Sequence, residues 1–238
     1  QMFGSVLKEH AKVNSPKKKA KKTKVVAVMP CTAKKYEAAR EEFKYDDQQS
    51  IDYVITTQEL AGMIRESGIV FSQILPEAVD MPFGIASGAG MIFGVTGGVT
   101  EAVVRYVMGD EAKNYLKMIA FTGVRGFEGV KEAVVPYGDR ELRIAIVSGL
   151  SNANTLVEKI KAGEIQYDFV EVMACPGGCI CGAGQPYAER GAKEKRGSGI
   201  YEADRMANVK ISSENPTAVM LYNGLLSGHK AHDLLHYK

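Results

Sequence analysis

The chain has 238 residues, of which 45% are hydrophobic and 24% are charged, enough to bury one sizeable core or two smaller lobes. Thirty basic and 28 acidic side chains leave a formal charge of +2, which argues against a nucleic-acid-binding surface. No stretch approaches the roughly 20 uncharged apolar residues of a membrane span. We therefore expect neither a nucleic-acid partner nor a membrane-spanning helix.

A basic, polar run at residues 15–24, SPKKKAKKTK, separates a short N-terminal segment from the first strand signal. Such a run usually forms a solvated loop, which is the interpretation we favour. The alternative is a docking patch for an acidic electron carrier. We therefore divide the chain into an N-terminal segment with its basic loop, 1–24, and an α/β region, 25–238.

Strand and helix signals alternate in the next part of the chain. We expect a strand at 25–30, a helix within 31–43, a strand at 51–57 and an amphipathic helix at 57–67. Thr57 and Glu59 have the spacing and residue types of a helix N-terminus.

The middle of the chain is glycine-rich and loop-like at 68–100, with a helical pattern from 101 to 116. Beyond it we expect a strand at 141–149, a helix at 152–163 that ends at Gly163, and a strand at 167–175. Strand, helix and strand in this order predict a parallel pair with a right-handed crossover. The fold class is therefore α/β, with parallel or mixed sheets flanked by helices.

The C-terminal third is polar, and we expect a loop followed by helix. His232 and His236 are four residues apart and would share one face of a helix. Two histidines at this spacing occur in metal sites, but no glutamate or third ligand stands beside them. A packed or solvated terminal helix is the interpretation that we favour.

The four cysteines are the strongest chemical signal: Cys31, Cys175, Cys179 and Cys181. A secreted disulfide framework would spread more cysteines through a smaller chain, so clustered cysteines beside glycines indicate metal or redox chemistry. Cys31 and Cys175 each follow a predicted strand, at the sheet edge where open α/β folds place their ligands.

The string EVMACPGGCICGAGQP, residues 171–186, has two glycines between Cys175 and Cys179. Glycine lets the backbone fold closely around a compact inorganic group, so the spacing favours an iron–sulfur cluster. Zinc is disfavoured because its structural knuckles use two short cysteine pairs, and no second pair is present. A thioredoxin-like site is weaker still, because Cys175 and Cys179 lack the CxxC spacing.

Two other features of the sequence could belong to a ligand-binding site. Lys34 follows Cys31 by three residues and would direct a cation toward an anionic ligand, although a lone lysine is more often solvent-exposed. The glycine-rich segment 87–105 precedes a helix, as in phosphate-binding loops. It contains neither GxxxxGK[ST] nor GxGxxG, so nucleotide binding is disfavoured.

Together these strings resemble the catalytic domain of iron-only ([FeFe]) hydrogenases, over nearly the whole chain. The motif MPCxxKxxE, the motif ExMxCxxGCxxG and the motif FGxTGGVxEAxxR are met at 29–37, 171–182 and 93–105. ITTxEL and VRGxxGVKEA are matched near residues 55 and 124, and the ending AHxxLH also fits. The resemblance makes 1–238 the C-terminal part of the catalytic domain, with 25–238 as its α/β cluster-binding region and the cluster between two lobes.

The resemblance implies an H-cluster, in which a 4Fe-4S cubane is joined to a two-iron unit that bears carbon monoxide, cyanide and a dithiolate amine. Cys31, Cys175 and Cys179 would ligate the cubane, and Cys179 would also bridge to the two-iron unit. Lys34 would donate a hydrogen bond to a cyanide, a contact that its charge favours.

Four further residues acquire roles only through the resemblance. Met29, Phe93 and Met173 would pack around the two-iron unit and keep it dry, although each taken alone would be an ordinary core residue. Glu37 would not contact the cluster itself; it would support the residues that do, or serve the fold. The implied reaction is reversible heterolytic cleavage of H2, or proton reduction.

The sequence departs from the family where the motif TSCCPxW is absent. We expect another chain or fragment to supply that motif and the fourth cysteine, and expect maturation proteins to install the two-iron unit. Electrons would arrive from a ferredoxin or cytochrome through another subunit. Thr100 and Cys181 replace the methionine and asparagine of many relatives; we take Cys181 as a variable neighbour, with redox modulation as the alternative.

The resemblance leaves two alternatives to a working hydrogenase. Narf-like and Nar1-like iron–sulfur assembly proteins resemble the same cysteine strings but lack the two-iron unit, and a sensory hydrogenase would turn over slowly. Lys34 and the intact FGVTGGVTEAVVR favour the hydrogenase. The compartment stays open, with the cytoplasm favoured and the periplasm reachable through a partner subunit.

Overall fold

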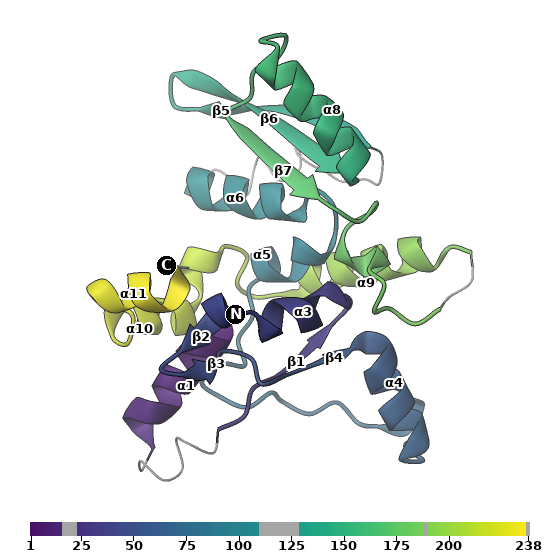
Figure 1. Cartoon of the computed structure of the whole chain (residues 1–238), viewed down its shortest axis with the longest axis vertical. Helices are drawn as coiled ribbons and strands as arrows, with labels where there is room; N and C mark the ends of the chain where they lie inside the picture. Colours follow the sequence, from purple (N-terminus) through teal and green to yellow (C-terminus); the bar gives the residue numbers. More distant parts are fainter. Residues whose placement is uncertain (16–22, 110–128, 188–189, 237–238) are drawn as a thin grey trace. The chain divides into compact units, whose positions relative to one another are not determined.

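The computed structural model describes residues 1–15, 23–109, 129–187 and 190–236 (Figure 1). The chain forms two compact units, which are described separately below. The first unit comprises Gln1–Ala78, Ala183–Tyr187 and Pro216–Lys238, and the second comprises Val79–Gly182 and Ala188–Asn215. Most of the basic run at 15–24, the end of the helix predicted for 101–116 and the start of the motif match near residue 124 lie outside the described residues.

A parallel pair of strands forms the centre of the first unit. Strand β1 (Val26–Met29) pairs with β4 (Tyr53–Thr56), so that Met29 lies opposite Thr56. Helix α3 (Ala33–Ala39) follows β1, and α4 (Thr57–Glu66) follows β4. These strands and helices confirm the alternation expected from the sequence. A short antiparallel pair, β2 (Lys44–Tyr45) and β3 (Gln48–Gln49), lies between them in sequence.

The remaining helices of the first unit pack against one another. Leu234 lies in α11 (His229–Leu235), and Leu226 precedes this helix. Both pack with Val6 of α1 (Met2–Asn14) in a buried apolar cluster. Helix α10 (Pro216–Asn223) precedes them in the chain. Segments from the two ends of the chain thus share one apolar cluster.

Asp52 ties α1 to the parallel pair. Its carboxylate accepts a hydrogen bond of 2.8 Å from the Val25 amide and forms ion pairs with Lys8 at 2.8 Å and Lys24 at 2.9 Å. Burial alone would raise the pKa of Asp52, but these partners outweigh burial and lower it. The folded state therefore stabilises the ionised form of the Asp52 carboxylate.

The second unit contains a sheet in the order β5-β6-β7. Strand β6 (Arg140–Ser148) pairs in parallel with β7 (Phe169–Met173), and α8 (Leu150–Lys161) connects them. The predicted parallel pair is thus confirmed. Strand β5 (Val130–Tyr137) pairs antiparallel with β6 and was not predicted. Pro136 weakens its strand signal, but an edge strand tolerates proline because one side needs no donor.

Helices cover both faces of this sheet. Ile144 and Ile146 of β6 pack with Val104 of α6 (Gly98–Met108), whereas Ala145 and Val147 pack with Leu156 of α8. Successive side chains of a strand point to opposite faces, so a continuous apolar run indicates burial on both. Figure 1 shows α6 and α8 on either side of the sheet.

The segment predicted as a loop at 68–100 contains short helices. These are a 3₁₀ turn at Phe71–Gln73, helix α5 (Gly88–Met91), a 3₁₀ turn at Ile92–Gly94 and the start of α6. Helix α9 (Ala192–Met206) packs against α5 and gives the polar C-terminal third its longest element. No helix in the described part of the chain has the length and apolar character needed to cross a bilayer.

The start of α4 differs from the prediction by one residue. Thr56, not Thr57, is the N-cap: its hydroxyl accepts the Glu59 amide at 3.1 Å, and the Glu59 carboxylate accepts the Thr56 amide at 2.7 Å. Position Thr56 is three residues before Glu59, which is the spacing that a reciprocal capping box requires.

We therefore expect Thr56→Ala to lower the free energy of unfolding by about 1 kcal/mol, because the Glu59 amide loses the hydroxyl that accepts its hydrogen bond. Thr57→Ala, one residue inside the helix, serves as the matched control and should change it by less than about 0.5 kcal/mol. Urea unfolding followed by circular dichroism measures both. Equal effects of the two substitutions would contradict the assignment of Thr56 as the N-cap of α4.

Candidate functional site

The turn that carries Cys31 is braced by the segment around Gly184. Cys31 lies two residues beyond the end of β1, and the Gly184 amide donates to the Pro30 carbonyl at 3.0 Å. The Gly184 carbonyl in turn accepts the Gln58 amide at 2.9 Å. A Cβ on Gly184 would lie 2.8 Å from the Cys31 nitrogen, so only glycine allows this approach.

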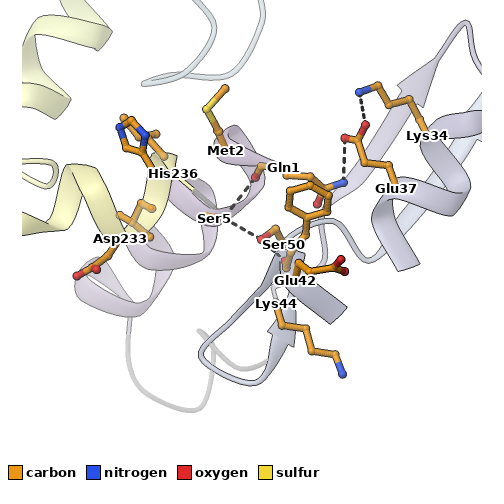
Figure 2. A pocket seen from close by; sticks show the side chains of 13 residues that line it. Gln1, Met2, Ser5, Lys34, Glu37, Glu42, Lys44, Ser50, Asp233 and His236 are labelled. Carbon is orange, nitrogen blue, oxygen red and sulfur yellow. Dashed lines mark hydrogen bonds and ion pairs between the residues drawn. The ribbon is translucent and has the colours of Figure 1, made fainter. Parts of the chain in front are cut away.

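Lys34 and Glu37 form an ion pair beside this turn, with 2.5 Å between Lys34 Nζ and Glu37 Oε2. Gln1 donates to the other Glu37 oxygen at 3.5 Å. Burial opposes the charge of Glu37, but Lys34 and Gln1 outweigh it, so the pKa of Glu37 is lowered. Both Lys34 and Glu37 line an open pocket of about 410 Å³ (Figure 2).

This ion pair was not anticipated, although Lys34 and Glu37 were both matched as motif residues. The i, i+3 spacing at the start of α3 is a signal for it. The ammonium group keeps further N–H donors when one is given to Glu37. Lys34 is thus oriented by a carboxylate of its own helix, and its contact with a cyanide stays a prediction.

The Cys175–Cys179 loop of the second unit is shaped by backbone hydrogen bonds. The Gly178 amide donates to the Cys175 carbonyl at 2.9 Å, and the Gly177 amide donates to Ser148 Oγ at 2.9 Å. Gly177 and Gly178 have φ values of 91° and 88°, in the left-handed region that other residues rarely adopt. The two glycines between the cysteines are therefore required by the turn itself.

The loop also lies directly against the glycine-rich segment. A Cβ on Gly178 would come within 2.8 Å of both the Gly94 carbonyl oxygen and the Thr96 nitrogen. Phe93 immediately precedes this contact, and its side chain is 48% exposed. Two of the motifs recognised in the sequence thus meet inside one unit.

Glu171 fixes strand β7 to the start of α6. Its side chain is almost fully buried, and one carboxylate oxygen accepts the Gly97 amide at 2.7 Å. The other oxygen accepts both the amide and the hydroxyl of Thr100 at 2.7 Å. A buried carboxylate needs such donors, and an α-helix N-terminus has amides to spare. The hydroxyl thus gives Thr100 a structural role in holding the Glu171 carboxylate.

The predicted ligands are thiols that a metal cluster could reach. Cys179 is exposed, Cys31 and Cys175 are half-buried, and none of them forms a disulfide among the described residues. Met29 and Met173 are also half-buried. Cys181 is partly buried and packs against an apolar cluster that includes Ile180; its interpretation as a variable neighbour of the ligands stays a prediction.

Each unit contributes its own part of the predicted ligand set. Cys31 belongs to the first unit, whereas Cys175 and Cys179 belong to the second. Within the described residues, no three His, Cys, Asp or Glu side chains gather in an arrangement that would hold a metal ion. The assignment of Cys31, Cys175 and Cys179 as one set of ligands therefore stays a prediction.

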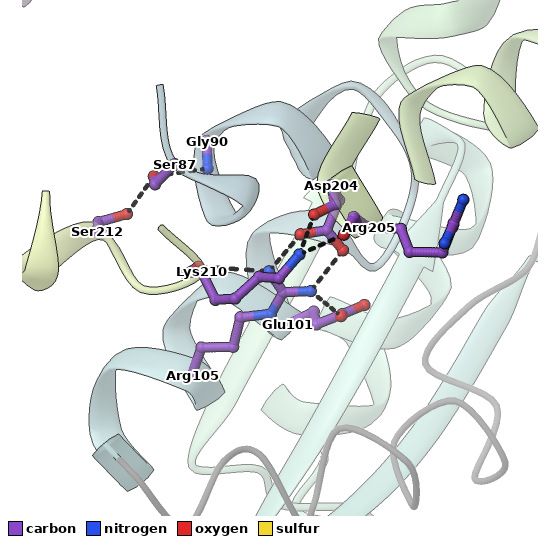
Figure 3. A network of polar contacts seen from close by, with 8 residues as sticks. All are labelled: Ser87, Gly90, Glu101, Arg105, Asp204, Arg205, Lys210 and Ser212. Carbon is purple, nitrogen blue, oxygen red and sulfur yellow. Dashed lines mark hydrogen bonds and ion pairs between the residues drawn. The ribbon is translucent and has the colours of Figure 1, made fainter. Parts of the chain in front are cut away.

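Helices α6 and α9 are joined by a buried ion-pair network (Figure 3). Arg105 donates to both carboxylate oxygens of Asp204, at 2.7 and 2.8 Å, and to Glu101 at 2.5 Å. All three side chains are less than a tenth exposed. Burial alone would lower the pKa of Arg105, but Asp204 and Glu101 outweigh it and raise the pKa.

The network gives a structural role to two motif residues, Glu101 and Arg105, and adds one that the sequence did not reveal. Asp204 stands 99 residues beyond Arg105. The nearest signal for it was a lone acidic residue in a helical pattern, which carries no information about its partner. A Cβ on Gly88 would meet Asp204 Oδ1 at 2.1 Å, so Gly88 leaves the room that the carboxylate occupies.

In the described part of the chain, the C-terminal histidines belong to no group of three or more His, Cys, Asp or Glu side chains that could hold a metal ion. The rings of His232 and His236 stack, with centroids 4.9 Å apart and planes inclined by 24°. His232 lies in α11, and His236 follows its last turn. Both histidines are exposed, whereas Leu234 of the same helix is buried, so the terminal helix packs on one side and is solvated at the histidines.

Together the folded features define an α/β protein whose cysteines follow the carboxyl ends of parallel strands. Residues 1–183 match the family described as iron only hydrogenase large subunit, C-terminal domain, and residues 190–238 match the iron hydrogenase small subunit. The chain belongs to the iron-only hydrogenase family. Membership associates it with oxidoreductases that carry iron–sulfur groups and an H-cluster.

Comparisons with individual hydrogenases support this family assignment. The NADP-reducing hydrogenase subunit HndD of Solidesulfovibrio fructosivorans is 42% identical, covering 99% of this chain and 41% of that protein. Iron hydrogenase 1 of Clostridium pasteurianum is 40% identical, covering 90% and 39%. A solved structure of [FeFe]-hydrogenase HydA1 from Chlamydomonas reinhardtii has a TM-score of 0.75 at 35% identity, covering 99% of this chain and 67% of that one.

A second group of relatives is more distant. The cytosolic Fe-S cluster assembly factor narfl of Xenopus tropicalis is 31% identical, covering 99% of this chain and 51% of that protein. The chain spans about two fifths of the length of the curated hydrogenases that it matches.

The Arg105 network yields a stability prediction. Arg105→Met would leave the carboxylates of Glu101 and Asp204 buried without their cation, and we expect the free energy of unfolding to fall by about 3–5 kcal/mol. Arg205→Met is the control, because Arg205 pairs with Glu202 at the exposed surface of α9. It should cost less than about 1 kcal/mol. Urea unfolding distinguishes the two; a small loss for both would contradict the buried role of Arg105.

Proposed function

We propose that the chain is the cluster-binding part of a hydrogenase that catalyses reversible heterolytic cleavage of H2, or proton reduction. The observation that carries the proposal is the complete MPCxxKxxE motif, with Lys34, in a chain 42% identical to a hydrogenase subunit and 31% identical to a cluster assembly factor. Lys34 would contact a cyanide of the two-iron unit, and the alternative function as an assembly factor has no such unit for it to contact.

The residues fit the proposed group. Three thiols that are exposed or half-buried suit iron–sulfur ligation, and the two glycines of the Cys175–Cys179 loop add no side chains of their own between the cysteines. Cys31, Cys175 and Cys179 would hold the 4Fe-4S cubane, with Cys179 as the bridge to the two-iron unit. A fourth cysteine would come from another chain or fragment that carries TSCCPxW.

The bound H-cluster would supply the metal chemistry, and the protein would set its geometry and dryness. Lys34 would hold a cyanide in place by a charged hydrogen bond while Glu37 keeps the ammonium oriented. Met29, Phe93 and Met173 would cover the two-iron unit and exclude water from it.

Other components follow from the same proposal. Maturation proteins would deliver the two-iron unit, and a ferredoxin or a cytochrome would exchange electrons with the cubane through a further subunit. The substrates are H2 and protons. The assembly-factor relatives support one competing function, in which the cubane is present and the two-iron unit is not.

The decisive test uses the chain co-expressed anaerobically with the TSCCPxW fragment and the maturation proteins. We expect infrared bands of metal-bound carbon monoxide and cyanide, together with H2 evolution from a reduced dye. Cys179→Ser should abolish both, because the bridge between the two metal units is lost. Cys181→Ser, two residues away, should retain most activity. A cubane signal without these infrared bands would instead support the assembly-factor function.

Lys34 permits a sharper test of the cyanide contact. Lys34→Met should reduce the infrared bands of the two-iron unit at least tenfold while the cubane's electron paramagnetic resonance signal persists, because one charged hydrogen bond contributes about 1.5–3 kcal/mol. Lys35→Met is the control, since its side chain is 44% exposed, as is that of Lys34. Equal loss of cubane and two-iron signals would refute the assigned role.

A further inference from the structure

Helix α9 places two cationic side chains on the Cys175–Cys179 loop. A Cβ on Gly177 would lie 2.7 Å from Lys193 Cε and 3.2 Å from Lys193 Nζ, so the end of the lysine lies directly over this glycine. Arg196, one turn later, donates from Nη1 to the Ile180 carbonyl at 3.1 Å. The loop is thus covered from α9 at a residue between the cysteines and at the residue after Cys179.

The closeness of Lys193 is built into the loop. Gly177 has the left-handed φ of 91° that the turn needs, and its missing side chain provides the space that the lysine occupies. Lys193 is half-buried, whereas Lys195 on the same helix is exposed. Arg196 fixes the register of α9 against the loop, because its hydrogen bond reaches the turn that follows Cys179.

A cation in this place acts on whatever the cysteines hold. Metal-bound cysteines are thiolates, so a cluster on Cys175 and Cys179 brings negative charge to the loop. One-electron reduction adds a further negative charge. A positive charge on the loop stabilises the reduced form more than the oxidised form, and partial burial strengthens the effect by lowering the local dielectric.

We propose that Lys193 raises the reduction potential of the iron–sulfur cluster held by Cys175 and Cys179, and that Arg196 positions α9 for this purpose. The inference rests on the proposed function only in requiring a cluster at these cysteines. Lys193 is a positioning and tuning residue and ligates no metal. Within a hydrogenase, the potential of the cubane governs how readily electrons pass between the partner and the reacting metal unit.

The test is a potentiometric titration of the cubane in the chain complexed with the TSCCPxW fragment, loaded with iron and sulfide but lacking the two-iron unit. Dithionite supplies the electron, and the electron paramagnetic resonance signal of the reduced cubane gives the midpoint potential. We expect Lys193→Gln to move the midpoint to a more negative value and Lys193→Arg to keep it near that of the unaltered protein.

Lys195→Gln removes the same charge from an exposed position of α9 and is the matched control. Its shift should be several-fold smaller than that of Lys193→Gln, because solvent screens an exposed charge. Equal shifts for Lys193→Gln and Lys195→Gln, or an upward shift for Lys193→Gln, would overturn the inference. Cubane content, measured by iron and sulfide analysis, shows that each variant is compared in its folded, loaded state.

The outcomes separate this inference from the proposed function. Cubane present without infrared bands after maturation would overturn the hydrogenase proposal, while the comparison of Lys193 variants would remain valid. Absence of any cubane in the unaltered complex would overturn the inference, because Lys193 would then have no cluster to act on.

Discussion

The geometry of the cysteine loop depends on one buried carboxylate. Glu171 lies in β7 four residues before Cys175, and it accepts three hydrogen bonds from Gly97 and Thr100. Each bond to a charged acceptor contributes about 1.5–3 kcal/mol, and together they offset the cost of burying the charge. Because Glu171 joins β7 to the start of α6, the loop after β7 and the turn before α6 are held in a fixed relation.

The second unit is built outward from that contact. The Gly178 backbone lies against Gly94 and Thr96, and Ser148 at the end of β6 accepts the Gly177 amide. On the far side of α6, Arg105 pairs with Asp204 and so attaches α9, which in turn brings Lys193 to the loop. Hydrogen bonds to backbone groups and one buried ion pair therefore link the cysteines to elements far away in sequence.

Local patterns in the sequence predicted β1, β4, β6, β7 and the helices that follow them, because burial leaves runs of apolar and β-branched residues. The cap at Thr56 was placed one residue late, and β5 was missed because Pro136 weakens a strand signal that an edge position tolerates. The motif residues were identified by resemblance. Their structural roles depend on contacts between distant segments, which no local pattern encodes. The ion pair of Arg105 with Asp204 is one example.

The separation of Glu171 from its partners also bears on the order in which the chain folds. Its hydrogen bonds span 74 residues to Gly97 and 71 residues to Thr100, and contacts between residues so far apart in the chain form later than local ones. A growing chain has no Glu171 to offer when Gly97 and Thr100 are made. The cysteine loop therefore takes its shape only after synthesis has passed β7.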